Sequence, residues 1–81
     1  MMGSDTILPV QCRMARAGLG LGVRDLARLA QVSPTTVTRL ERGDELYAET
    51  IAAIRIALEE AGAWFPPYGA FPTVQIRDHV A

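Results

Sequence analysis

The sequence predicts a mainly helical fold, a single domain of about four helices that ends in a short β arm. Within residues 1–62, apolar residues recur at the three- and four-residue spacing of amphipathic helices. Prolines and glycines stand at the ends of these stretches, where they start and stop helices. Residues 63–81 differ in composition, with three prolines and an alternating β-branched run that favours a loose hairpin. We therefore divide the chain into a helical domain, residues 1–62, and an arm, residues 63–81.

The first two helices are short and are separated by a glycine-rich loop. Pro9 suits a first helical position, and good helix formers continue to Ala17 before glycines at positions 18, 20 and 22 interrupt the pattern. The second helix is expected over Val23–Ala30. One of its faces is apolar, and the other carries Arg24 and Arg28 four residues apart.

The third and fourth helices have clear start and stop signals. Ser33 is a good N-cap with Pro34 at the first helical position, and Gly43 ends the third helix after about Arg42. The fourth helix spans the segment AETIAAIRIALEEAG, and its glycine, Gly62, suits the position after the last turn. The inward positions expected on these two helices are Val37, Leu40, Ile51, Ile54, Leu58 and Ala61.

The second and third helices, joined by a tight turn at Gln31–Val32, form a helix-turn-helix motif. Its second helix keeps a solvent face of threonines and arginines, whose hydroxyl, methyl and guanidinium groups can read base edges in a major groove. The stretch LARLAQVSPTTVTRLERG resembles the motif of the phage repressor and Cro family of the XRE type. The resemblance of the chain to this family extends over about Pro9 to Gly62. This resemblance implies a lambda-repressor-like bundle and a sequence-specific regulator that binds double-stranded DNA.

The resemblance also implies a role for individual residues. The recognition helix would be residues 34–42, with Ser33 capping it near a phosphate and Arg39 reaching a base or a phosphate. Arginines of the first two helices, Arg13 and Arg28 among them, are further candidates for phosphate contacts. The DNA-binding residues that we expect are Arg24, Ser33, Pro34, Thr35, Thr36, Thr38, Arg39 and Arg42.

Two positions of the family pattern bear on stability, and two others depart from the pattern. Arg16 and Glu41 occupy the positions of an ion pair that ties the first helix to the recognition helix, where loss of one partner leaves a charge unpaired. Val23 stands where a glutamine often binds the DNA backbone. The loop after the recognition helix is acidic, and we expect its Asp44 and Glu45 to repel phosphates.

The charge is unevenly distributed, although the net charge is only −1. Between Arg13 and Arg42, six arginines stand against two acidic residues, whereas from Gly43 onward two arginines stand against six acidic residues. A basic segment favours a nucleic-acid partner, and the alternative is ordinary solvated charge.

The arm contains four of the five aromatic residues within eight positions. A domain this small has limited room to bury them, so we expect the arm to form a homodimer interface. The alternative is that the arm folds back over the fourth helix of its own chain, and the sequence leaves both arrangements open. The interface residues that we expect are Trp64, Phe65, Tyr68, Phe71, Val74 and Ile76.

The sequence offers few candidate residues for catalysis or metal binding. Cys12 is a lone cysteine in an apolar helical pattern, which predicts a small buried side chain, and His79 has no second histidine to help it bind zinc. We expect no catalytic residue, no metal, no cofactor and no enzymatic activity. No apolar run approaches the roughly 20 residues of a membrane span, and the start of the chain is a poor signal peptide, so we expect a cytoplasmic protein.

Two functions fit these observations. The first is a DNA-binding transcriptional regulator, a homodimeric repressor. The second is the antitoxin of a toxin–antitoxin pair, in which the acidic half and the aromatic arm hold the toxin while the basic half binds the operator.

Overall fold

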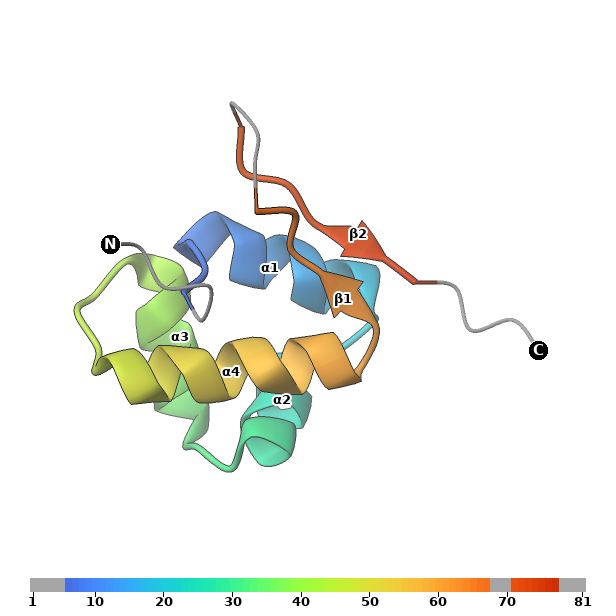
Figure 1. The fold of residues 1–81 in the computed structure, drawn as a ribbon. Coiled ribbons are helices and arrows are strands. Elements are labelled where there is room, and N and C mark those ends of the chain that lie inside the picture. Colours follow the sequence, from blue (N-terminus) through green and yellow to red (C-terminus); the bar gives the residue numbers. More distant parts are fainter. Residues whose placement is uncertain (1–5, 68–70, 78–81) are drawn as a thin grey trace.

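A computed structural model describes residues 6–67 and 71–77, and in that part the chain forms four helices and one two-stranded sheet (Figure 1). The helices are α1 (Pro9–Gly18), α2 (Val23–Ala30), α3 (Pro34–Arg42) and α4 (Ala48–Glu60). The strands are β1 (Ala63–Trp64) and β2 (Gln75–Ile76), which pair antiparallel. The predicted mainly helical fold with a short β arm is confirmed.

The helix ends lie close to where the start and stop residues predicted them. The Ser33 Oγ accepts a hydrogen bond from the Thr36 N–H at 3.2 Å, so Ser33 caps α3 as expected. Gly43 and Gly62 follow α3 and α4 with φ values of 92° and 121°, which suit glycine. Gln31 takes the left-handed conformation, with φ of 59°, and turns the chain between α2 and α3.

The core lies where the four helices meet. Leu26 of α2, Val37 of α3, and Ile54 and Leu58 of α4 are fully buried, as their spacing predicted. Further apolar residues pack at the edge of this cluster and stay partly exposed. Among them are Leu19, Leu21, Ala30 and Ile51.

The arm packs on its own helices: β1 contacts α4, and β2 contacts both β1 and α1 (Figure 1). The Arg77 N–H donates to the Gly62 carbonyl at 2.7 Å, and the Gln11 side-chain amide donates to the Thr73 carbonyl at 3.0 Å. Gly18 of α1 allows this approach, because a Cβ there would lie 2.8 Å from the Ile76 Cγ1. The fold-back arrangement is therefore present, and it involves α1 as well as α4.

The aromatic residues of the arm do not all face outward. Phe65 is buried, with its ring centroid 5.1 Å from the Arg55 Cζ, so the expectation that it stays exposed for a partner is wrong. The reason is that the alternation of β1, with Ala63 buried and Trp64 exposed, continues into the next residue and turns Phe65 inward. Val74 is partly buried against the core, whereas Phe71 is 79% exposed. Tyr68 lies outside the described residues.

Candidate nucleic-acid interface

The solvent face of α3 carries the small polar side chains that the sequence predicted there. Pro34, Thr35 and Thr38 are exposed, because Val37 and Leu40 turn the opposite face of the helix into the core. Ser33 is also exposed, but its hydroxyl is engaged at the helix cap, 2.9 Å from the Thr36 hydroxyl. The outward hydroxyls of the threonines and the guanidinium groups of the last turn are therefore the groups that α3 presents to solvent.

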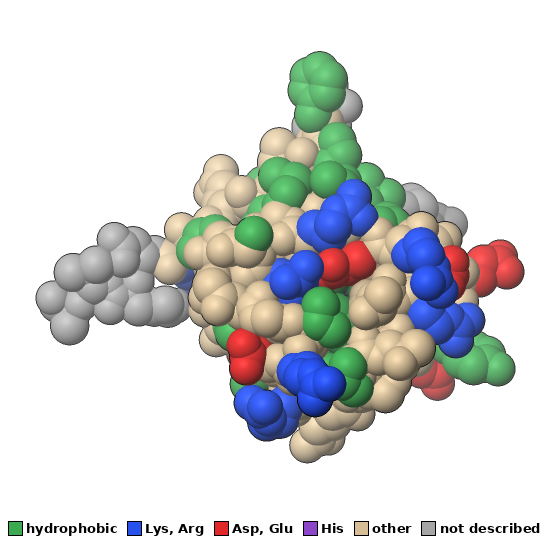
Figure 2. Space-filling model, turned by 180° about the vertical axis from the view of Figure 1, so that it is seen from behind, with side chains coloured by type: hydrophobic (Ala, Val, Ile, Leu, Met, Phe, Trp, Pro, Cys, Tyr) green, Lys and Arg blue, Asp and Glu red, His purple; other side chains and the backbone are tan. Residues whose placement is uncertain are grey.

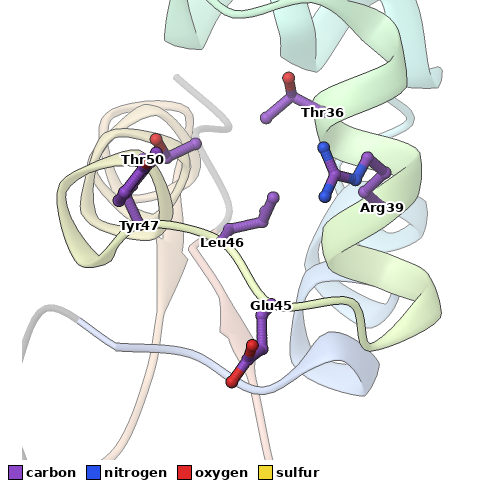
Figure 3. Close-up of a pocket in the computed structure, with 6 residues that line it drawn as sticks. All are labelled: Thr36, Arg39, Glu45, Leu46, Tyr47 and Thr50. Carbon is purple, nitrogen blue, oxygen red and sulfur yellow. The ribbon is translucent and has the colours of Figure 1, made fainter.

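A groove of about 620 Å³ runs along one side of this face (Figure 3). Thr36 and Arg39 line it from α3, and the Arg39 guanidinium points from the helix toward this space. The loop after α3 and the start of α4 form the opposite wall. The residues of that wall are Glu45, Leu46, Tyr47 and Thr50.

The two arginines of the last turn of α3 share one acidic partner. The Asp44 Oδ2 lies 2.6 Å from the Arg42 Nη2 and 3.6 Å from the Arg39 Nε. Hydrogen bonding to Asp44 raises the pKa of the Arg42 guanidinium, and the same bond lowers the pKa of the Asp44 carboxyl. The acidic loop thus contacts the predicted DNA-binding arginines through Asp44. The sequence analysis did not predict this contact. The signal was available, because a glycine in the left-handed conformation turns the next residue back toward the helix end.

The arginines of α1 and α2 differ in their availability. Arg24 is exposed and forms no ion pair with the residues that the structure describes. The Arg28 Nη1 lies 3.7 Å from the Asp25 Oδ1 in a pair exposed to solvent. Arg13 donates a hydrogen bond to the Glu41 main-chain carbonyl, so its guanidinium helps to hold α3. Arg24 is thus the least encumbered of these three for a phosphate contact.

The predicted ion pair between α1 and α3 is present and has two hydrogen bonds. The Arg16 Nε donates to the Glu41 Oε2 at 2.8 Å, and its Nη2 donates to the Oε1 at 2.9 Å. The Cys12 thiol also donates to the Oε2, at 3.3 Å. Cys12 is buried as expected, but it is a hydrogen-bond donor as well as an apolar side chain.

Burial and these contacts shift the pKa values of the group. Burial, together with the hydrogen bond to Glu41, raises the pKa of the Cys12 thiol to about 12. For Glu41, burial alone would raise the pKa, but the bonds from Arg16 and Cys12 outweigh it and lower the pKa below its ordinary value. Glu41 is therefore ionised at neutral pH and holds α1 against the end of α3.

Arginine side chains gather on the face of the molecule that is turned away in Figure 1 (Figure 2). Acidic side chains lie between them on the same face (Figure 2). This mixture agrees with the ion pairs of the structure, in which Asp25, Glu41 and Asp44 each lie beside an arginine. The basic segment seen in the sequence is therefore partly neutralised in the folded chain.

Among residues 6–67 and 71–77, no three His, Cys, Asp or Glu side chains come together as metal ligands would. None of the helices there combines the length and the apolar character that crossing a membrane requires.

Comparisons with known proteins assign no family to the chain. No protein-family model matches the sequence, and no curated protein matches it. The resemblance to the phage repressor and Cro type therefore rests on the motif itself, and a proposal about function depends on the geometry of α2 and α3.

Proposed function

We propose that this protein binds double-stranded DNA in the major groove through α3 and regulates transcription. The observation that carries the proposal is the division of α3 into two faces. Val37, Leu40 and Glu41 fasten one face to the core and to α1, and the other face presents Thr35, Thr38 and Arg39 to solvent. A helix held this way enters a groove as a rigid body, with short side chains that let the backbone approach the bases.

Electrostatics supports the same face. Arg24 stands at the start of α2, and Arg39 and Arg42 stand in the last turn of α3; all three are exposed, and arginines are common phosphate contacts. Polyanion contacts of this kind release counterions, so affinity should fall steeply as salt is raised.

Homodimerisation would suit a protein with so small a reading surface. Two copies that bind half-sites roughly 34–36 Å apart combine two modest contacts into one specific one. The exposed side chains of Trp64, Phe71 and Ile76 give the arm an apolar surface for a second copy. Sedimentation of the full chain at tens of micromolar tests the proposed homodimer. A monomer at this concentration would contradict it, and the apolar surface of the arm would then be available to another protein, such as a toxin.

The function is tested by selection of bound fragments from a random duplex pool, followed by anisotropy titrations of the full chain. We expect a selected duplex to be bound, with affinity falling as salt rises from about 50 to 200 mM. Arg39→Ala should weaken binding by about 1–3 kcal/mol and relax the base preference, if the contact is bidentate to guanine. Arg77→Ala removes the same charge from an exposed site on the arm, so it serves as the matched control.

Three results would count against the proposal. If the selection enriches no duplex, the proposal that the chain binds double-stranded DNA is wrong. Equal weakening by Arg39→Ala and Arg77→Ala would remove the role of α3. Equal loss by Arg39→Ala on selected and random duplexes would make Arg39 a phosphate contact and not a base contact.

A further inference from the structure

Asp44 follows the last turn of α3, and the helix end fixes its position. Gly43 takes a φ of 92° and turns the chain back over the helix. The Asp44 N–H then donates to the Arg39 carbonyl at 3.0 Å, and the Gly43 N–H donates to the Leu40 carbonyl at 3.0 Å. Because both bonds are to the backbone of α3, the Asp44 side chain starts from a defined place beside the last turn.

One carboxylate oxygen of Asp44 serves both arginines of that turn. The Oδ2 lies 2.6 Å from the Arg42 Nη2, 3.2 Å from the Arg42 Nε and 3.6 Å from the Arg39 Nε. The Oδ1 lies 3.4 Å from the Arg42 Nε. The two cations that α3 offers to DNA at this end are therefore already in contact with an anion of their own chain.

The three side chains remain open to solvent, which makes the contacts exchangeable. Arg39 is 48% exposed, Arg42 63% and Asp44 34%. Ion pairs at such exposure contribute little to stability and break readily when another anion approaches. A phosphate of a bound duplex is such an anion, and it has to displace the carboxylate before it gains the guanidinium.

We infer that Asp44 is an internal competitor for the arginines of α3 that lowers the affinity of the chain for every duplex. The inference rests on the proposed DNA-binding function. On random DNA, Arg39 and Arg42 exchange one anion for another, so the net gain is small. On a preferred sequence, Arg39 also gains a bidentate contact with a base, which a carboxylate cannot match in specificity. Asp44 thus lowers the affinity for both kinds of duplex by about the free energy of its own pairs, and only a duplex that adds a base contact to Arg39 still gains clearly from the exchange.

The neighbouring residue separates this effect from simple repulsion. Glu45 is exposed and forms no ion pair with residues in the described ranges. Asp44→Asn and Glu45→Gln each remove one negative charge from the same loop and nearly preserve side-chain shape. A long-range field changes almost equally in the two variants, so any difference between them reports the pairing with Arg39 and Arg42.

The test is a set of anisotropy titrations of the full chain against a random-sequence duplex and a selected duplex, at several salt concentrations. We expect Asp44→Asn to bind the random duplex about fivefold more tightly at low salt, the equivalent of one exposed ion pair released. Its salt dependence should steepen by about one released counterion, and its affinity for the selected duplex should rise by a similar factor. Glu45→Gln should change affinity for the random duplex by less than about twofold.

Arg42→Gln provides a second measurement, made in the unmodified chain and in the Asp44→Asn background. The inference then does not depend on the folding of the Asp44→Asn variant alone. With Asp44 present, Arg42→Gln should cost little affinity for the random duplex, because the arginine is already occupied. In the Asp44→Asn background, the same change should cost several times more. Thermal melting of each variant verifies that the affinities belong to folded protein.

The outcomes distinguish this inference from the proposed function. Equal effects of Asp44→Asn and Glu45→Gln, or equal costs of Arg42→Gln in the two backgrounds, would overturn the competition while leaving DNA binding in place. If the unmodified chain binds neither duplex, both the function and the inference are wrong.

Discussion

Replacement of Glu41 by alanine should destabilise the whole domain without touching the exposed face of α3. Its carboxylate is only 9% exposed and accepts two hydrogen bonds from Arg16 and one from Cys12. In Glu41→Ala, the Arg16 guanidinium, 23% exposed, keeps one bond to the Leu21 carbonyl at 3.2 Å. A positive charge is then left in a partly buried place with no anion beside it.

The size of the effect follows from that geometry. Loss of one partner from a fully buried ion pair costs about 3–5 kcal/mol, and the remaining exposure of Arg16 reduces this to about 2–3 kcal/mol. A domain of this size has roughly 4–12 kcal/mol of stability in total, so the variant would lose a large share of it. The melting temperature should fall by about 10–20 °C.

Thermal and urea unfolding followed by far-UV circular dichroism measure this loss. Thr35→Ala is the control, because Thr35 is exposed on α3 and its removal should change stability by no more than about 0.5 kcal/mol. A melting temperature of Glu41→Ala equal to that of the unmodified chain would refute the reasoning, since it would mean that the pair contributes nothing.

The same residue sets a pH dependence. Because the pKa of Glu41 is lower in the folded chain than its ordinary 4.5, its contribution is fully present above pH 4.5 and is lost as pH falls through the folded value. Glu41→Gln should therefore lose less stability than the unmodified chain as pH falls below 4.5. Parallel acid-unfolding curves of the two proteins would contradict the assignment.

Three further changes test the packing of the chain. The Cys12 thiol, buried and with its pKa raised to about 12, should react with a soluble thiol reagent at neutral pH only as fast as the domain opens; fast labelling of folded protein would contradict the buried placement. Phe65→Ala should lower the free energy of unfolding, measured in urea, by about 3–5 kcal/mol, because the ring is part of the core. A loss below about 1 kcal/mol would contradict the buried position of Phe65. Gly18→Ala should leave the helices as stable as before but push Ile76 away, so that the Arg77 amide exchanges its hydrogen faster by NMR; unchanged exchange would mean that the arm does not depend on this contact.

The helices were predictable because their signals are local. A serine before a proline starts α3, and a glycine stops it, whatever the rest of the chain does. The partner of Arg16 was also predictable, but only through the resemblance to a known family, since nothing in the spacing from Arg16 to Glu41 indicates contact by itself.

The arm and the acidic loop were harder to predict because their contacts depend on distant parts of the chain. Whether Phe65 faces the core is decided by where β1 lies against α4, and a count of aromatic residues does not contain that information. The sequence alone showed only that Asp44 is an acidic residue in the loop after α3. Its shared contact with Arg39 and Arg42 required the left-handed turn at Gly43, which directs the carboxylate toward the helix.

Arg13 and Arg16 both bind Glu41, one through its main-chain carbonyl and the other through its carboxylate. This double attachment separates the residues that hold α3 from those that would meet a ligand, since Thr35, Thr38 and Arg39 take no part in it. The residues of the exposed face can therefore be substituted with little change in the free energy of unfolding. A library varied at these three positions should therefore yield mostly folded proteins. Under the proposed function, its members would differ in the DNA sequence that they prefer, so specificity could be changed independently of stability.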